Sequence, residues 1–503
     1  MTNTFATHVD ERVLDVYARA REPDNPMELR DLWLGRVEHE LGGHARHQAL
    51  AERWRDSRRL RSVQPDEVLR SRATVRFVKE LFNWYFRDDL YGDLRDSARY
   101  ILSSGSVEEE RWGLPQSLKE CIRYALDRDW YGYSDLRGRA PVREAIAAYE
   151  NARVAGVRYG PEHVAMTMGG TFAVSSLADF LLHDRTPAAS PALCAIPNYP
   201  PLVETVARRH DTRLVPLPSE NGLTSLEPLI AALTPDTPLV LLQTVGNPTG
   251  AAVPEEALAR LIRAASPSTV IMLDECHEWL GTYEQRSSAR AASNVVRVSS
   301  LSKTWSAPGV KVGWFLADPA FIAEYHEHAS SSFGGPSSFF YTVVEVLARM
   351  ERWLITGVDT PGPAELKEFE ESYGLGLDRL RHAYRGYRTE RLRRTEDLTT
   401  LRDATTVRLA ELPARVLPPR FSINTTVELP GWDDSYRCFR DILRETGVSL
   451  FPGILTFGFS GAVMRVTTAR PWEELAPAFD RLGAHLSAAA SPLTTTLDRG
   501  RDS

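Results

Sequence analysis

The spacing of apolar and polar residues changes along the chain, and these changes divide it into three zones and a tail. Residues 1–105 carry apolar residues at helical spacing, as in RFVKELFNWYFRDDL and SARYIL, and predict a helical N-terminal extension. Residues 155–345 alternate short β-rich runs with amphipathic helices, which is typical of an α/β domain. Residues 346–490 indicate a smaller α+β unit, and residues 491–503 a disordered tail.

The middle zone contains six strand candidates rich in Val, Ile and Leu, with helix-like segments between several of them, such as 201–210 and 255–265. Strands of this composition joined by helical crossovers predict a mainly parallel sheet that is covered on both faces. The strand candidates are 192–197, 213–218, 239–245, 269–275, 295–300 and 312–317.

The last zone begins with residues 355–372, where Pro and Gly interrupt the pattern and indicate a surface insertion. The elements predicted after it are a long charged helix at 375–402, strands near 407–429, a helix at 435–446, a strand at 463–468 and a helix at 471–489.

Composition and charge narrow the class of protein. The net charge of −7 does not favour a polyanionic partner, and residues 1–100 hold 18 basic and 18 acidic residues, unlike a basic DNA-binding module. No apolar run is long enough to span a bilayer, and the N-terminus lacks the apolar core of a signal peptide. The four cysteines have no paired spacing. We therefore expect a cytoplasmic protein without a nucleic-acid partner, a membrane span or a metal site.

Polar residues follow several of the predicted strands, at the edge of an open α/β sheet where ligands bind. One of them is a lysine, in a chain with 60 basic residues of which only five are lysine. Their types suit an aromatic, phosphorylated ligand with a carbonyl group: a lysine for an imine, an aspartate for a ring cation, a tyrosine for stacking and a helix N-terminus for phosphate. They are Tyr199, Asn247, Asp274, His277, Ser300, Ser302 and Lys303, with Gly169, Gly170 and Thr171 at the start of a helix.

Seven motifs in order carry a resemblance to a known family. They are YGYSDLRGRAPVREAIAAY (131–149), GGT (169–171), PNYP (197–200), NPTG (247–250), DECH (274–277), SLSKTWSAPGVKVGW (300–314) and MRVTTA (464–469). On these motifs residues 100–490 resemble the class I/II aminotransferase superfamily of fold-type I enzymes, which depend on pyridoxal 5'-phosphate. The first hundred residues have no counterpart in the resemblance.

The resemblance implies a fold and a subunit arrangement. The large cofactor-binding domain would be residues 155–345, with a mainly parallel, seven-stranded type of sheet. The small α+β domain would combine residues 346–490 with residues 106–154, which also supply a segment of the subunit interface. The family forms homodimers with shared active sites, so Tyr133 would reach the cofactor phosphate of a neighbouring subunit, with Tyr131 and Trp130 as the competing residues nearby.

The resemblance also implies a role for each site residue. Lys303 would bind the cofactor as a Schiff base and then move a proton at the substrate Cα. Asp274 would hold the pyridine nitrogen protonated, Asn247 would bind the phenolic oxygen, and Tyr199 would stack on the ring. Arg465 would bind the substrate α-carboxylate, and Gly105 would offer a backbone contact to the substrate. Contacts to the cofactor, chiefly at its phosphate, would come from Gly169, Gly170, Thr171, Ser300, Ser302 and Lys311.

Two residues depart from the family pattern. His277 stands where the family usually has tyrosine. It is either a replacement that keeps the hydrogen bond to the cofactor or, because imidazole titrates near neutral pH, a source of altered chemistry. Lys311 stands where most relatives have arginine, and it offers phosphate a point charge instead of a bidentate fork.

The predicted function is an enzyme that acts on the α-amino group and Cα of an L-amino acid, through an external aldimine and a quinonoid. Transfer of the amino group to a 2-oxo acid is the first expectation. The same site geometry also suits a lyase that eliminates, replaces or cyclises, or a decarboxylase. A ligand-sensing regulator is the alternative from a different class, and the balanced charge of the N-terminal zone argues against it.

The substrate side chain is only partly specified by the sequence. Family members that act on dicarboxylates use a second arginine from the partner subunit, and the corresponding region here, residues 325–341, has none. This argues against a preference for aspartate or glutamate, unless side chains from the N-terminal zone intervene.

Overall fold

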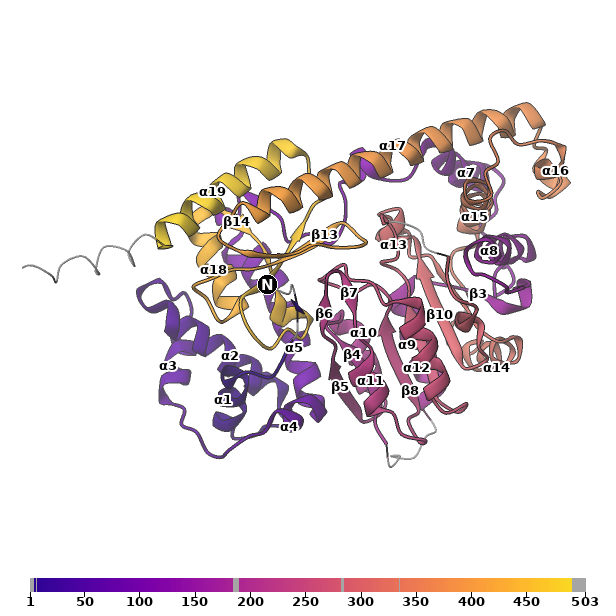
Figure 1. Ribbon diagram of the computed structural model, residues 1–503. Helices are drawn as coiled ribbons and strands as arrows, with labels where there is room; N and C mark the ends of the chain where they lie inside the picture. Colours follow the sequence, from indigo (N-terminus) through magenta and orange to yellow (C-terminus); the bar gives the residue numbers. More distant parts are fainter. Residues whose placement is uncertain (1–3, 6, 184–189, 282–284, 334, 491–503) are drawn as a thin grey trace, which may run out of the picture.

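The computed structural model describes residues 4–5, 7–183, 190–281, 285–333 and 335–490 (Figure 1). The predicted tail at 491–503 lies outside the described residues. The central feature is a seven-stranded sheet in which every strand runs parallel except β11, which pairs antiparallel with both of its neighbours. This confirms the predicted α/β fold. In sheet order the strands are β3 (Val164–Thr167), β11 (Gly313–Leu316), β10 (Val295–Ser300), β9 (Val270–Asp274), β8 (Leu239–Gln243), β4 (Ala192–Ile196) and β5 (Thr212–Pro216).

Both faces of this sheet are buried, as the unbroken apolar runs predict. In β8, Leu239 and Leu241 join one hydrophobic core and Val240 and Leu242 join another, because successive side chains point to opposite faces. The first face is covered by α9 (Gly170–Leu182), α10 (Pro200–Ala207) and α14 (Pro319–Ala329). The second is covered by α8 (Ala140–Arg153), α11 (Glu227–Ala232), α12 (Glu255–Ala264) and α15 (Tyr341–Ile355).

A second, four-stranded sheet forms in the last part of the chain, and the long helix α17 (Leu377–Ala410) leads to it. The predicted strand start near 407 was wrong, because α17 continues to Ala410. Its buried side chains recur at helical spacing, at Leu398, Thr405 and Leu409. The strands in sheet order are β12 (Arg415–Leu417), β13 (Asn424–Glu428), β16 (Val463–Thr467) and β15 (Phe451–Pro452), accompanied by α18 (Ser435–Thr446) and α19 (Trp472–Ala490).

Strand β3 and two pairs of two-residue strands were absent from the sequence prediction. Strand β3 was not recognised, although it forms one edge of the large sheet. Two-residue strands also occur in the N-terminal zone: β1 (Thr4–Phe5) pairs with β6 (Ser219–Glu220), and β2 (Tyr100–Ile101) pairs with β14 (Val448–Ser449). The predicted surface insertion is anchored by Phe369, which is buried with its ring centroid 6.1 Å from that of Trp353.

The N-terminal zone is mainly helical. It packs against helices of the large-sheet domain and against helices that accompany the four-stranded sheet. Its elements are α1 (Glu11–Arg19), α2 (Pro26–Leu41), α3 (Gln48–Asp56), α4 (Pro65–Arg70), α5 (Arg72–Trp84) and the π-helical segment η2 (Tyr85–Asp93). Helix α5 contacts α10, and α2 contacts α18 (Figure 1). The apolar residues of this zone belong to the same core as α9, α10 and α18.

Buried ion pairs also hold the N-terminal zone to α18. Arg440 on α18 binds Glu38 on α2, and it also binds Asp89 in η2 with a distance of 2.9 Å between Nη2 and Oδ1. The N-terminal extension is therefore an integral part of the fold. Within the described residues, none of the helices combines the length and apolar character that crossing a membrane requires.

Candidate active site

A cavity of about 390 Å³ lies at the carboxyl ends of β8, β9 and β10, beside the start of α9. The carboxyl ends of parallel strands meet at one edge of a sheet, so residues far apart in sequence come together there. All of the predicted site residues except Tyr133 line this cavity. They are Gly105, Gly169, Gly170, Thr171, Tyr199, Asn247, Asp274, His277, Ser300, Ser302, Lys303, Lys311 and Arg465.

Lys303 lies one turn beyond β10, in the short helix α13 (Leu301–Thr304). Ser300 caps this helix, because its Oγ accepts a hydrogen bond from the backbone N–H of Ser302 at 3.3 Å. The Lys303 ammonium donates to the carbonyl oxygen of Gly105 at 3.0 Å. Burial, followed by repulsion from Arg465, lowers the pKa of Lys303 from 10.5 to about 8. A larger fraction of the Lys303 side chain is therefore neutral near pH 7 than for an ordinary lysine, and the neutral amine is the form that attacks carbonyl groups.

Asp274 ends β9 and is held by two donors. Its Oδ2 accepts from Gln243 Nε2 at 2.9 Å, and its Oδ1 accepts from the backbone N–H of Cys276 at 3.1 Å. Gln243 and Asp274 are directly paired in the β8–β9 register, which explains why they meet. The carboxylate is buried, with 5% of the residue exposed, and it is positioned to bind a cationic group in the cavity.

The start of α9 lies at one end of the cavity, where its backbone N–H groups can bind an anion. The first turn of a helix has backbone N–H groups without partners inside the helix, and here it begins at Gly170 and Thr171. Gly169 has φ of +86°, a conformation that favours glycine. A Cβ on Gly170 would lie only 2.9 Å from Cys276 Sγ, so glycine allows the helix to start against the end of β9. Lys311 lines the same cavity and adds a positive charge.

Arg465 on β16 forms the opposite side of the site. Its Nη1 donates to Asn247 Oδ1 at 2.9 Å, its Nη2 donates to the Ser103 carbonyl at 2.8 Å, and its guanidinium carbon lies 4.1 Å from the centre of the Phe451 ring. Burial lowers the pKa of Arg465 to about 10, so the group stays charged at neutral pH. Within the described parts of the chain, Arg465 has no carboxylate partner and its Nε makes no hydrogen bond. An anionic ligand would supply the missing partner.

His277 is buried near the lysine, and its Nδ1 lies 3.4 Å from Ser422 Oγ. Burial, and then the charges of Lys303 and Arg465, lower the pKa of His277 to about 3. A group with so low a pKa is neutral at every pH above about 4. This favours a fixed hydrogen-bonding role for the imidazole over one in which it titrates near neutral pH.

The substitution His277→Tyr is expected to retain the cofactor that the resemblance implies, with the dissociation constant changed by no more than about tenfold. A hydrogen bond contributes only about 0.5–1.5 kcal/mol, and a phenol replaces the one that an imidazole donates. Cofactor content and absorbance after gel filtration measure this. Complete loss of the cofactor would show that the imidazole is not a tolerated replacement.

The two predicted tyrosines differ in position. Tyr199 starts α10 and lines the cavity, with its ring 5.7 Å from that of Phe82 in an edge-on contact. Tyr133 is fully exposed and does not line the cavity of its own subunit. Its predicted contact to a neighbouring subunit stays a prediction.

Several cavity residues escaped the sequence prediction, among them Phe82, Phe86, Gln243, Cys276 and Phe451. Gln243 had a detectable signal, since it is a polar residue in an otherwise apolar strand candidate. The two phenylalanines of the N-terminal zone had none, because helical spacing marks a buried face without showing what the face contacts.

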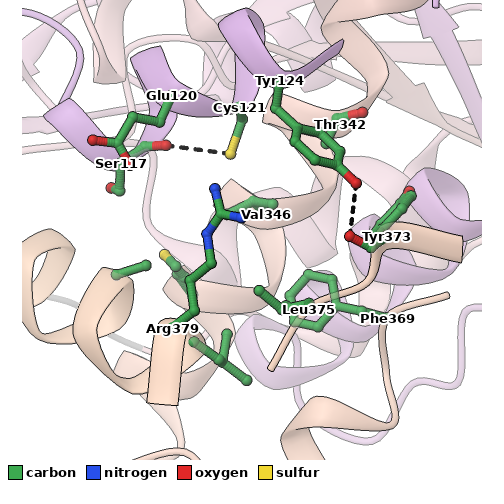
Figure 2. Close-up of a pocket in the computed structure, with 13 residues that line it drawn as sticks. Ser117, Glu120, Cys121, Tyr124, Thr342, Val346, Phe369, Tyr373, Leu375 and Arg379 are labelled. Atoms are coloured by element: carbon green, nitrogen blue, oxygen red, sulfur yellow. Dashed lines mark hydrogen bonds between the residues drawn. The ribbon is translucent and has the colours of Figure 1, made fainter. Parts of the chain in front are cut away.

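A second cavity, of about 100 Å³, lies among α7 (Gln116–Asp127), α15 and α17, and is lined mainly by apolar side chains (Figure 2). Tyr124 donates from its hydroxyl to the Tyr373 carbonyl at 2.7 Å, and Cys121 donates to the Ser117 carbonyl at 3.3 Å. Burial raises the pKa of Cys121 to about 12, so this thiol is protonated. The cavity contains none of the predicted site residues.

Residues 101–365, more than half of the chain, match the family described as aminotransferase class I and II. The chain belongs to this family, and the predicted resemblance is confirmed. Solved structures agree on the fold. An aspartate aminotransferase from Thermus thermophilus, with maleate, matches with a TM-score of 0.62 at 20% identity over 84% of this chain and 99% of that one. An N-succinyldiaminopimelate aminotransferase from Mycobacterium tuberculosis matches with 0.61 at 21% identity over 78% and 94%.

Curated relatives are similar over a shorter stretch. An aromatic amino acid aminotransferase from Mycobacterium marinum is 28% identical over 193 residues, which are 37% of this chain and 51% of the relative. An aspartate aminotransferase from Pyrococcus horikoshii is 25% identical over 262 residues, 50% of this chain and 65% of the relative. The chain thus spans between about half and two thirds of the length of these relatives.

Proposed function

We propose that the protein is a pyridoxal-phosphate-dependent aminotransferase that moves the α-amino group of an amino acid to a 2-oxo acid. The observation that supports this most is the charge of the cavity. Lys303, Lys311 and Arg465 line it, and Asp274 is the only carboxylate among its described lining residues. Such an excess of positive charge suits a phosphate and a carboxylate together, which cofactor and substrate would supply.

The residues present fit the cofactor. The first turn of α9, with Ser300 and Lys311, would hold its phosphate. Asp274 would face its ring nitrogen, and Asn247 and His277, which line the same cavity as the lysine, would serve the phenolic oxygen. When bound, the cofactor supplies an electrophilic carbonyl carbon and a ring that accepts electrons from the substrate Cα.

The chain's own residues would perform the remaining tasks. Arg465 would bind the substrate carboxylate with a bidentate fork, kept in orientation by Asn247 and the Ser103 carbonyl. Lys303, with its lowered pKa, would take a proton from Cα and return one to the cofactor side as general base and acid. The carboxylate of Asp274 would be held in place against the ring nitrogen by the two donors that it accepts from, Gln243 and the Cys276 N–H.

We also propose a homodimer in which the site is shared. Tyr133 is consistent with this, since its side chain is fully exposed and so available for contact with another subunit. Its mutation to phenylalanine would then weaken the hold on the cofactor phosphate without touching any residue of its own subunit's cavity.

The rate at which the cofactor attaches to the protein is expected to depend on pH through Lys303. Only the neutral amine attacks a carbonyl, and at pH 7 a pKa of about 8 leaves roughly 300-fold more neutral amine than the ordinary value of 10.5. The rate should rise about tenfold per pH unit below pH 8 and level off above it. Stopped-flow absorbance would measure this, with a simple alkylamine as control. A rate that keeps rising to pH 10 would contradict the lowered pKa.

An amino-acid panel, assayed with and without a 2-oxo acid, tests the reaction. Amine exchange that requires the 2-oxo acid is the expected result. Release of ammonia, carbon dioxide or a cyclised product without that acceptor would contradict transamination and indicate a lyase built on the same site.

A further inference from the structure

The N-terminal extension supplies part of the cavity wall. Phe82, near the end of α5, and Phe86, in the π-helical segment η2, both line the cavity that contains Lys303 and Arg465. Their ring centroids lie 5.0 Å apart. Irregular helical turns of the π type occur frequently at functional sites, and this one begins where the chain passes the cavity.

The two phenylalanines belong to a packed aromatic cluster. Each ring lies 6.2 Å from that of Phe451, and Phe82 also contacts Tyr199. Tyr85, between them in sequence, is buried, and its hydroxyl donates to the Leu450 carbonyl at 3.2 Å. With η2 held to α18 by the buried Asp89–Arg440 pair, the wall is fixed in position before any substrate binds.

The wall begins next to the proposed carboxylate anchor. The ring of Phe451 lies against the Arg465 guanidinium, so a substrate held there by its carboxylate places the rest of the molecule beside aromatic carbon. The charged side chains among the described lining residues are Lys303, Lys311, Asp274 and Arg465. Under the proposed function each of these already faces the cofactor or the α-carboxylate.

A charged substrate side chain would therefore meet no opposite charge in this part of the cavity. Removing a carboxylate or an ammonium group from water without a partner is costly, whereas an apolar side chain gains from burial against phenyl rings. The imidazole of His277 offers no positive charge to a substrate side chain either, since burial lowers its pKa and keeps it neutral.

We infer that Phe82 and Phe86 determine substrate specificity, selecting amino acids with an uncharged, apolar side chain and disfavouring those with a carboxylate or ammonium group. The inference rests on the proposed function for the position of the α-carboxylate at Arg465. It assigns to the extension, which precedes residues 101–365 matched by the family model, the role of choosing the substrate.

Binding of unreactive carboxylic acids to the full-length, cofactor-loaded protein tests this by calorimetry. The probes are 3-phenylpropanoate, succinate and 4-(trimethylammonio)butanoate, whose quaternary ammonium group cannot form an imine. We expect 3-phenylpropanoate to bind at least about tenfold more tightly than the two charged probes, as hydrophobic pockets discriminate by this much. The double variant Phe82→Ala with Phe86→Ala should reduce the difference to about twofold or less. Phe321→Ala, a half-buried phenylalanine on α14 outside the cavity, is the matched control and should retain it.

The variant Phe86→Arg tests the inference in the opposite direction, because it should create affinity for a charged side chain. It should raise the affinity for succinate by at least about tenfold, because it adds the missing partner for a second carboxylate. An unchanged affinity for succinate, a wild-type preference for succinate, or a double variant that keeps the original ratio would each overturn the inference. Absence of amine exchange in the wild type would instead contradict the proposed function, while the probe affinities remain measurable on the cofactor-loaded protein.

Discussion

Lys303→Ala is expected to abolish covalent attachment of the cofactor and to lower the rate of amine exchange by about 10²-fold to 10⁴-fold or more, the range for removal of a positioned proton-transfer group. The reason is chemical: an imine requires a primary amine, and of the two lysines among the described lining residues of the cavity, Lys303 is the one whose charge interacts with both Arg465 and Asp274. The visible absorbance of the purified protein and single-turnover kinetics measure the two effects.

A matched control comes from another of the five lysines. Lys367 is exposed and lies outside the cavity, so Lys367→Ala should leave both readouts unchanged. Borohydride reduction followed by peptide mapping should label the peptide that contains Lys303. An unchanged absorbance spectrum in Lys303→Ala would disprove the assignment of this lysine.

Arg465→Lys and Arg465→Ala are expected to raise KM for the amino acid while the cofactor stays bound. Truncating one partner of a buried, hydrogen-bonded charge pair costs about 2–5 kcal/mol, which is roughly a 30-fold to 4,000-fold change. Lysine keeps the charge but loses the bidentate fork, so it should lie at the lower end of this range. Initial rates over a range of amino-acid concentrations give KM, and absorbance gives the cofactor content.

The control for Arg465 is Arg260→Lys, since Arg260 is a surface arginine paired with Glu227. It should change KM by less than about twofold, because exposed ion pairs contribute little. A KM that is unaffected in Arg465→Ala would place the substrate carboxylate elsewhere, and it would also remove the anchor on which the specificity of the aromatic wall depends.

The contribution of the N-terminal extension shows where prediction from sequence ends. The helical spacing of RFVKELFNWYFRDDL, residues 76–90, predicted a helix with a buried face, and the first part of this segment lies in α5. That Phe82 and Phe86 lie at the cavity depends on contacts of α5 with α10 and of η2 with α18, which join segments more than a hundred residues apart. Local periodicity reports that a side chain is buried, not which distant segment buries it.

The polar side of the site was more accessible to prediction. Asp274 and Lys303 follow apolar runs that are recognisable as buried strands, and parallel strands bring their carboxyl ends to one edge by geometry alone. The hydrogen bonds of Asp274 to Gln243 and of Arg465 to Asn247 were not predictable, because they depend on strand register and on how the small sheet meets the large one.

By itself, the sequence determined the α/β fold, and it predicted the chemistry of the ligand that the strand ends suit and the lysine that would react with it. These follow from short-range patterns: unbroken apolar runs, helix starts, and residue types with one distinctive reactivity. Only the tertiary structure decided the lowered pKa values of Lys303 and His277, the lack of a carboxylate beside Arg465 in the described chain, and the aromatic wall. Each of these depends on desolvation and on distances between remote segments, which packing alone sets.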